Sequence, residues 1–281
     1  MDKTDGQLLS GVRVPGFQPQ LRTQYVLDLG KPDDADCGRG LNETLDVIAA
    51  LEGVGIHSCV VGTKALVYYG AHRVPMNWEI CVPTDSYERA ITLLTSPPLN
   101  EKYEVWHRVV PGPKTLMHTY PRFTLKGVNF FFILLPAFEC LLSPSPDQCE
   151  RSTSGIPYPK LELFAQSLLD LQQYADLEDL VDGMDLDEAW GETHLQLDKP
   201  PPVEHIREKN DMIARSLPED MREAVSLALL SERPRPSRDV WQRIVSTKHR
   251  RINDELPRHR YLTRFRKVGS KDPRERKERQ V

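Results

Sequence analysis

The sequence predicts an α/β (α+β) fold in which helices flank a mixed β-sheet and a helical extension follows at the C-terminus. Three observations predict it. Residues 59–82 read as strand, glycine turn, short helix and second strand. Residues 130–134 are apolar without interruption, which is typical of a strand that is buried on both faces. After the proline run at 200–202, residues 204–252 show helical periodicity.

Taken in order, the chain begins with residues 1–40, which are rich in Gly, Pro, Gln and Asp and show no periodicity. We expect an irregular arm there. Asn42 can cap a helix that continues to about Glu52, because the apolar residues that follow recur at helical spacing.

The segment from Val60 to Val82 is the centre of the prediction. Val60 and Val61 are β-branched, as expected in a buried strand. Gly62 can adopt backbone angles that are closed to other residues, and Thr63 can cap the following helix. Such a turn points backbone N–H groups at an open cleft, which makes it a candidate seat for a phosphate group.

Four further elements complete the predicted sheet and its cover. A helix is expected from Asp85 to Leu94, because Asp85 and Glu88 have the spacing of a capping box. A strand is expected over 103–110. The runs 117–125 and 128–135 read as two strands of a hairpin joined at Lys126–Gly127.

The remaining chain is predicted to be mainly helical. Leu161, Phe164, Leu168 and Leu171 read as core positions, and three helices are expected over 204–217, 218–231 and 237–252. We therefore divide the sequence into the arm 1–40, a core 41–199, a helical extension 200–256 and a basic, disordered tail 257–281.

Composition excludes several classes of protein. The chain has 281 residues, 39% of them hydrophobic and 28% charged, which is ordinary for a globular protein. No apolar run approaches 18 residues, so no transmembrane helix is expected. The first residues have no secretory layout, and the five cysteines form no Cys-x-x-Cys pair. We expect reduced thiols and a cytoplasmic or nuclear location.

The glycine turn and the strand after it resemble the nucleotidyltransferase superfamily, the polymerase-β-like fold. Gly62-Thr63 stands at the Gly-Gly or Gly-Ser turn of that family. Arg73-Val74-Pro75-Met76-Asn77-Trp78-Glu79 has the spacing of the Arg-x-Thr-x-Asp-x-Asp form of antitoxin-type members. Asn-Trp-Glu-Ile-Cys-Val-Pro resembles a fungal branch of the fold. The resemblance covers about residues 42–190.

The resemblance also assigns candidate site residues. Gly62, Thr63, Lys64 and Arg73 match nucleotide-binding positions, and Glu79 matches a metal-binding, catalytic carboxylate. Asn77 and Asn129 stand where the family has the two other carboxylates. Ser167 occupies the place of a helix lysine that would face triphosphate.

These departures bear on the expected chemistry. Two-metal nucleotidyl transfer needs carboxylates that hold Mg²⁺ and offset charge on the attacking and leaving oxygens. An amide oxygen is neutral and binds a hard cation more weakly. We therefore expect a degenerate site that binds a nucleotide or another phosphate ligand weakly, or none at all, and that serves as a binding or regulatory module. The alternative is an active Mg²⁺-dependent transferase that uses Glu79 and modifies RNA, protein or a small molecule.

Charge is distributed unevenly along the chain, although the formal net charge is only −4. Residues 233–281 hold 17 Lys and Arg against six Asp and Glu, whereas the rest holds 20 against 35. Residues 161–198 contain eleven acids and no Lys or Arg. The basic residues can pair with these acids within the chain, or they can contact nucleic acid, RNA in particular. For the second reading the candidate contacts are Arg250, Arg251, Arg258, Arg260, Arg264, Arg266 and Lys267.

Overall fold

The computed structural model describes residues 40–75, 77–107, 111–128, 130–219, 229–252 and 256–275. The chain divides into two units, Met1–Asp36 and Cys37–Val281, and all described residues belong to the second. The predicted irregular arm therefore lies outside the described residues, except for Gly40. No helix in the described ranges is long and apolar enough to cross a membrane.

A five-stranded mixed sheet forms the centre of the second unit, in the order β1-β2-β5-β4-β3. The pair β2–β5 is parallel, and the other neighbouring pairs are antiparallel. A separate two-stranded sheet pairs β6 with β7. The strands are β1 Cys59–Val61, β2 Trp78–Val82, β3 Tyr103–His107, β4 Pro121–Leu125, β5 Phe131–Pro136, β6 Cys149–Arg151 and β7 Pro157–Pro159.

The two strands expected around the glycine turn are confirmed as β1 and β2, with the short helix α3 (Gly62–Tyr68) directly after β1. The expected hairpin is confirmed as β4 and β5. Its first strand begins at residue 121 rather than 117, because Leu116 to Thr119 form a turn closed by a Thr119 N–H···O=C Leu116 bond of 2.8 Å.

Strand β5 is the middle strand of the sheet, as its uninterrupted apolar sequence predicts. Alternate side chains point to opposite faces of the sheet. Ile80, Phe132 and Leu134 join a large core that includes residues of the surrounding helices. On the other face, Cys81 and Ile133 join a smaller core. The two faces therefore have different environments, and Glu79 lies on the side of the smaller core by alternation.

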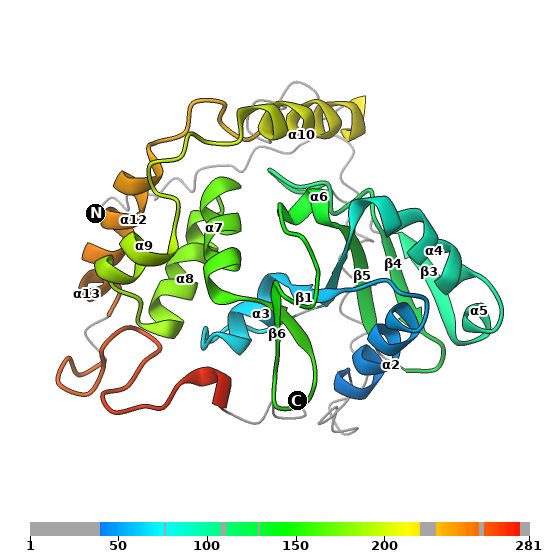
Figure 1. The fold of residues 1–281 in the computed structure, drawn as a ribbon, viewed down its shortest axis with the longest axis horizontal. Coiled ribbons are helices and arrows are strands. Elements are labelled where there is room, and N and C mark those ends of the chain that lie inside the picture. Colours follow the sequence, from blue (N-terminus) through cyan, green and yellow to red (C-terminus); the bar gives the residue numbers. More distant parts are fainter. Residues whose placement is uncertain are drawn as a thin grey trace, which may run out of the picture. The chain divides into compact units, whose positions relative to one another are not determined.

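The helices that flank the sheet agree with the predicted periodic segments. Figure 1 shows α7, α8, α9 and α12 grouped beside one another. The 3₁₀ turn η1 directly precedes α4. The short helices α5 and α6 lie next to strands of the sheet. The helices of the predicted core are α2 Leu41–Glu52, η1 Thr84–Ser86, α4 Tyr87–Thr95, α5 Leu99–Lys102, α6 Ala137–Cys140, α7 Leu161–Asp170, α8 Tyr174–Met184 and α9 Glu188–His194.

The C-terminal extension contains α10 (Val203–Ser216), α12 (Ser237–Ser246), α13 (Lys248–Arg251) and the 3₁₀ turn η3 (Pro273–Glu275). The first and last of the three predicted helices are thus present. Most of the middle one, 218–231, lies outside the described residues. Trp241 of α12 has no exposed surface, so the extension contributes to the large core.

The tail differs from the disordered segment that its composition suggests. Within residues 256–275, Thr263 is fully buried and its hydroxyl donates to the carbonyl of Asp182 over 2.6 Å. Pro273 is also buried and packs against Gly70, which has a φ of +92°. The sequence signal was misleading because charged side chains that would stay solvated in a free tail here have specific acidic partners.

Candidate functional site

A cleft of about 440 Å³ lies beside the glycine turn. Its wall includes the ends of β1 and β5, the loop 113–117, helix α6 and the junction of α7 with α8. Gly62 and Glu79, two residues that the sequence singles out, both line it. The structure therefore brings the predicted turn and the predicted carboxylate to one cavity.

Strand pairing explains why Gly62 and Glu79 meet. In the antiparallel β1–β2 pair, Val61 is directly opposite Glu79. Gly62 follows with a φ of +62°, in the left-handed region that favours glycine. A Cβ atom at Gly62 would overlap the Glu79 carboxylate. Glycine is thus required at this position both by the backbone angle and by the close approach of the carboxylate.

The other predicted nucleotide-binding residues do not line this cleft themselves, although Arg73 contacts Asp176 of its wall. The Lys64 ammonium is 4.1 Å from the centroid of the Trp78 ring, a cation–π contact. Thr63 is half-buried and does not line the cleft. Arg73 pairs with two aspartates of α8: its Nη1 is 2.7 Å from Asp176, and its Nε bonds Asp179.

The predicted carboxylate-replacing residues are only partly described. Asn77 is half-buried and does not line the cleft. Its Oδ1 atom is buried and has no hydrogen-bond partner in the described part of the chain. Asn129 lies outside the described residues. Among the described residues, no group of three or more His, Cys, Asp or Glu side chains is arranged to hold a metal ion.

Two further acidic residues of the cleft wall, Glu139 and Asp176, were not predicted. Asp176 pairs with Arg73. Glu139 is 5% exposed and lies 3.3 Å from the ammonium of Lys209, which has no exposed surface. It also accepts hydrogen bonds from the Thr115 hydroxyl (2.7 Å) and, at its other oxygen, from the Tyr120 hydroxyl (3.2 Å). Both carboxylates are thus already neutralised by cations of the same chain.

The cleft wall also contains a cation that sequence reasoning missed, the exposed Lys114. It follows Pro113 in a loop and has a φ of +60°. No sequence signal identifies Lys114, because a single lysine between Pro113 and Thr115 is typical of any surface turn. Burial raises the pKa of Tyr174, another residue of the wall, so its phenol stays protonated near neutral pH.

Ser167 of α7, which stands in the place of the family's lysine, lies on the cleft wall. Its hydroxyl donates to the carbonyl of Cys140 at the end of α6. The hydroxyl is therefore used to join α6 to α7. A serine hydroxyl is neutral, so Ser167 does not supply the positive charge that a lysine would offer to a triphosphate.

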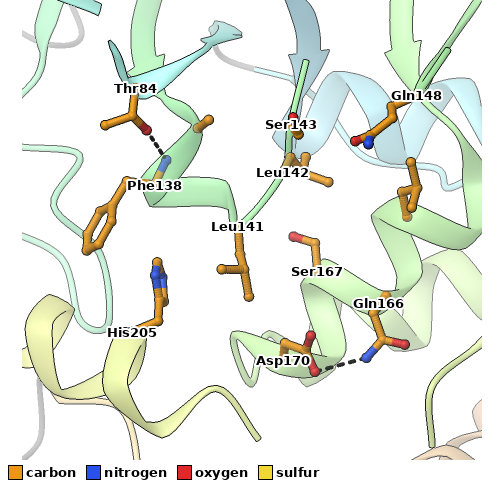
Figure 2. Close-up of a pocket in the computed structure, with 12 residues that line it drawn as sticks. Thr84, Phe138, Leu141, Leu142, Ser143, Gln148, Gln166, Ser167, Asp170 and His205 are labelled. Carbon is orange, nitrogen blue, oxygen red and sulfur yellow. Dashed lines mark hydrogen bonds between the residues drawn. The ribbon is translucent and has the colours of Figure 1, made fainter. Parts of the chain in front are cut away.

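A second pocket of about 400 Å³ shares Leu142 and Ser167 with the cleft. Figure 2 shows His205 beside Phe138, and Gln166 donating to Asp170 over 2.9 Å. Burial, with Lys209 as a smaller cause, lowers the pKa of His205 to about 4. Burial raises the pKa of Asp170. The pocket is thus lined by a neutral imidazole and a partly desolvated carboxylate.

The basic residues predicted to contact nucleic acid divide into two groups. Arg251 makes two hydrogen bonds to Asp182, of 2.8 and 2.7 Å, and Arg264 pairs with Asp179 and Asp182. Arg266 donates to the carbonyl of Ser270. The side chains that remain exposed are Arg250, Arg258, Arg260 and Lys267.

Helix α8 therefore supplies acidic side chains that bind basic residues of the tail. Asp182 has no exposed surface and Asp179 only 4%. The neighbouring Asp185 accepts a hydrogen bond of 2.7 Å from Lys248. Three cations from residues 248–264 thus bind the acidic segment of the same chain, the first of the two arrangements that the charge distribution allows.

No family model matches the sequence, and no curated protein matches it. The solved structures that are similar to this chain include the following three. A crystal structure of ANT(2'')-Ia in complex with adenylyl-2''-tobramycin is 12% identical, with a TM-score of 0.30, and the match covers 66% of this chain and 93% of that one. A solution structure of the antibiotic-resistance factor ANT(2'')-Ia is 11% identical with a TM-score of 0.28, covering 66% and 88%. The JHP933 protein from Helicobacter pylori is 12% identical with a TM-score of 0.32, covering 76% and 92%.

Proposed function

We propose that this chain is a nucleotidyltransferase-like protein whose cleft is degenerate, and that it acts as a binding or regulatory module without transferring nucleotides. The observation that carries the proposal is the contact of Gly62 with the Glu79 carboxylate in the cleft. The resemblance expects a glycine turn and a carboxylate at these two positions, whereas the position two residues before Glu79 is an asparagine.

The charge of the cleft supports a non-catalytic role. Glu139 and Asp176 are paired with Lys209 and Arg73, so neither is available to a metal without loss of an ion pair. Mg²⁺ is usually held by one or two carboxylates together with waters and substrate phosphates, so a pair of ions needs several carboxylates close together. The described residues bring no group of three or more His, Cys, Asp or Glu side chains together to hold a metal ion, so this donor set does not fit such a pair.

The cations of the cleft support weak binding of a phosphate ligand. Arg73, which the resemblance assigns to nucleotide, is held by Asp176 and Asp179, and position 167 is a serine. Lys114 and the backbone of the glycine turn remain as phosphate-binding groups on the wall. Phosphoryl transfer depends on positioning and electrostatic stabilisation, so loss of these charges is expected to cost orders of magnitude in rate.

The test uses the full chain with labelled ribonucleoside triphosphates, Mg²⁺ or Mn²⁺, and RNA, protein or small-molecule acceptors. We expect no label transfer and at most weak nucleotide binding by calorimetry. Robust transfer that Glu79→Gln abolishes would overturn the proposal. Glu101→Gln is the matched control, because Glu101 is an exposed carboxylate on α5 that does not line the cleft.

Asn77→Asp separates the proposal from the active alternative. If the site is degenerate, restoring a carboxylate raises Mg²⁺ or Mn²⁺ affinity, measured by calorimetry against the same substitution in the Glu79→Gln background. If the chain is an enzyme that uses Asn77 as a neutral ligand, the substitution instead lowers an existing activity. The two outcomes have opposite signs.

A further inference from the structure

The second pocket, of about 400 Å³, is lined by residues of α6, α7 and the start of α10 (Figure 2). It shares Leu142 and Ser167 with the cleft, but neither Gly62 nor Glu79 lines it. Its volume is in the usual range for small-molecule sites, which are mostly apolar and contain a few polar groups that orient the ligand. The wall of this pocket has both kinds of group.

The apolar part of the wall comes mainly from α6 and the residues directly after it. Leu141 follows α6 with a φ of +48°, in the left-handed region that is uncommon for a residue with a branched side chain. Figure 2 shows this side chain among those of His205, Ser167 and Asp170. The rings of Phe138 and His205 lie with their centroids 4.4 Å apart. The pocket therefore offers an aliphatic and aromatic surface.

The polar part of the wall is centred on Asp170, the last residue of α7. Its Oδ1 atom accepts a hydrogen bond of 2.9 Å from the Gln166 side-chain amide. The carbonyl oxygen of that amide in turn accepts from the N–H of Gln196 over 2.8 Å. Gln166 therefore orients the carboxylate, and within the described residues no donor bonds the Oδ2 atom of Asp170.

Asp170 is left without a cation of its own chain. Among the residues that the structure describes, no Lys or Arg forms an ion pair with it, whereas Asp176 and Asp182 of α8 both have such a partner. Burial raises the pKa of Asp170, against the smaller opposing effects of Gln166 and Lys199. Asp170 also ends α7, where the partial negative charge of a helix C-terminus favours a cation. A positively charged ligand would therefore stabilise both the carboxylate and the helix end.

The other titratable groups beside the pocket do not repel a cation. Burial lowers the pKa of His205 to about 4, so its imidazole is neutral near pH 7. Lys209, also on α10, does not line the pocket and has no exposed surface, and its ammonium is bound by Glu139. The wall thus combines one oriented carboxylate with neutral and apolar groups.

We propose that this pocket binds a small primary amine with an apolar body, held by an ion pair between its ammonium group and Asp170. The apolar body packs against Phe138 and Leu141, and the ammonium group donates to the free Oδ2 atom of the carboxylate. An aromatic body adds ring contacts with Phe138. The inference goes beyond the proposed function and does not rest on it, since amine binding is measured without a nucleotide.

The experiment titrates the isotope-labelled full chain with phenethylamine at neutral pH and follows the backbone amide signals by NMR. We expect saturable shifts at Gln166, Ser167 and Asp170. Two matched probes separate the contributions: 2-phenylethanol keeps the ring and replaces the ammonium group with a hydroxyl, and ethylamine keeps the ammonium group without the ring. Each should bind at least about tenfold more weakly than phenethylamine, because each lacks one of the two contacts.

Asp170→Asn tests the ion pair without changing the shape of the pocket, since an asparagine can still accept from Gln166. It should weaken phenethylamine binding at least about tenfold and leave 2-phenylethanol binding unchanged. Glu162→Gln is the control that changes neither, because Glu162 is on the same helix but does not line the pocket.

Four results would each overturn the proposal. They are equal affinities for phenethylamine and 2-phenylethanol, an unchanged affinity in the Asp170→Asn variant, amide shifts confined to α8, or no saturation below about 10 mM, where a ligand of this size should bind. The first, third and fourth are measured on the unmodified chain, so they do not depend on the folding of a variant.

Discussion

Replacing Lys209 with methionine should destabilise the protein more than any exposed charge change on the same helix. Lys209 is on α10, yet it has no exposed surface. Its ammonium donates to the carbonyl of Glu139 over 2.9 Å and lies 3.3 Å from the Glu139 carboxylate. Methionine keeps the length and apolar contacts of the stem, so the substitution isolates the charge.

The magnitude follows from what remains after the substitution. The Glu139 carboxylate stays buried with only neutral donors, the Thr115 and Tyr120 hydroxyls and the Leu116 N–H. Breaking a buried ion pair from one side costs about 3–5 kcal/mol, because it leaves an uncompensated charge. With a urea m-value of about 3 kcal/mol/M, the unfolding midpoint should fall by about 1–2 M.

Two controls accompany the urea titration. Arg207→Met removes an exposed ion pair with Glu232 from the same helix, where the arginine side chain is 61% exposed, and should cost about 1 kcal/mol or less. The double variant Lys209→Met/Glu139→Gln should recover most of the loss, since a neutral amide can still accept from Thr115 and Leu116. A Lys209→Met cost equal to that of Arg207→Met, or no recovery in the double variant, would refute the reasoning.

Two other predictions concern charges that the structure buries. Arg251→Met should lower the free energy of unfolding by about 2–3 kcal/mol, because it removes two hydrogen bonds to the fully buried Asp182, which keeps Arg264 as its remaining cation. It should also expose residues 256–275 to limited proteolysis, whereas Arg250→Met, at an exposed neighbour, should do neither. For His205, the folded pKa of about 4 lies below the usual histidine value of 6.5, so the unfolded state binds more protons between these values. Stability is therefore lost as pH falls from 6.5 to 4, by about 3 kcal/mol at most. His205→Gln should remove this part of the pH dependence of the free energy of unfolding. Identical curves of unfolding free energy against pH for the variant and the unmodified chain would contradict this assignment.

Local sequence patterns predicted the sheet better than the site. The β-branched Val60 and Val61 and the uninterrupted apolar run of β5 identify buried strands because strand burial has a local signature. The contact of Gly62 with Glu79 follows from the same pattern, since a short antiparallel pair fixes its own register. The strands and the contact of Gly62 with Glu79 can be predicted because they are determined by residues that are close in sequence.

The ion pairs could not be predicted in this way. Arg73 matched a nucleotide-binding position, but its partners Asp176 and Asp179 are more than a hundred residues away in sequence and become neighbours only when α8 packs beside α3. Lys209 and Glu139 are likewise far apart, and both look like ordinary surface residues in sequence. Charge counts identified an acidic and a basic segment that could pair, but not which residues do.

The same pairing decides what to expect of the basic tail towards nucleic acid. Arg251 and Arg264 are held by buried aspartates, so they are not available to phosphate without loss of those pairs. Arg250, Arg258 and Arg260 remain exposed. Deleting everything after Glu232 would be a poor test, because it also removes the fully buried Trp241. The better comparison is the full chain against the triple variant Arg250→Ser/Arg258→Ser/Arg260→Ser.

Labelled RNA is titrated against both proteins at about 50 and 200 mM salt, with Arg207→Ser/Arg215→Ser as a control that removes two exposed cations from α10. We expect the affinities of the full chain and the triple variant to agree within about twofold, because we expect the cations of the tail to bind the acidic segment of the same chain rather than phosphate. If the three arginines did contact phosphate, their removal would reduce the slope of log affinity against log salt by about 3. A loss of binding that is confined to the triple variant and steepens as salt falls would contradict this expectation. It would show that the exposed side of the tail contacts phosphate while its other side holds α8.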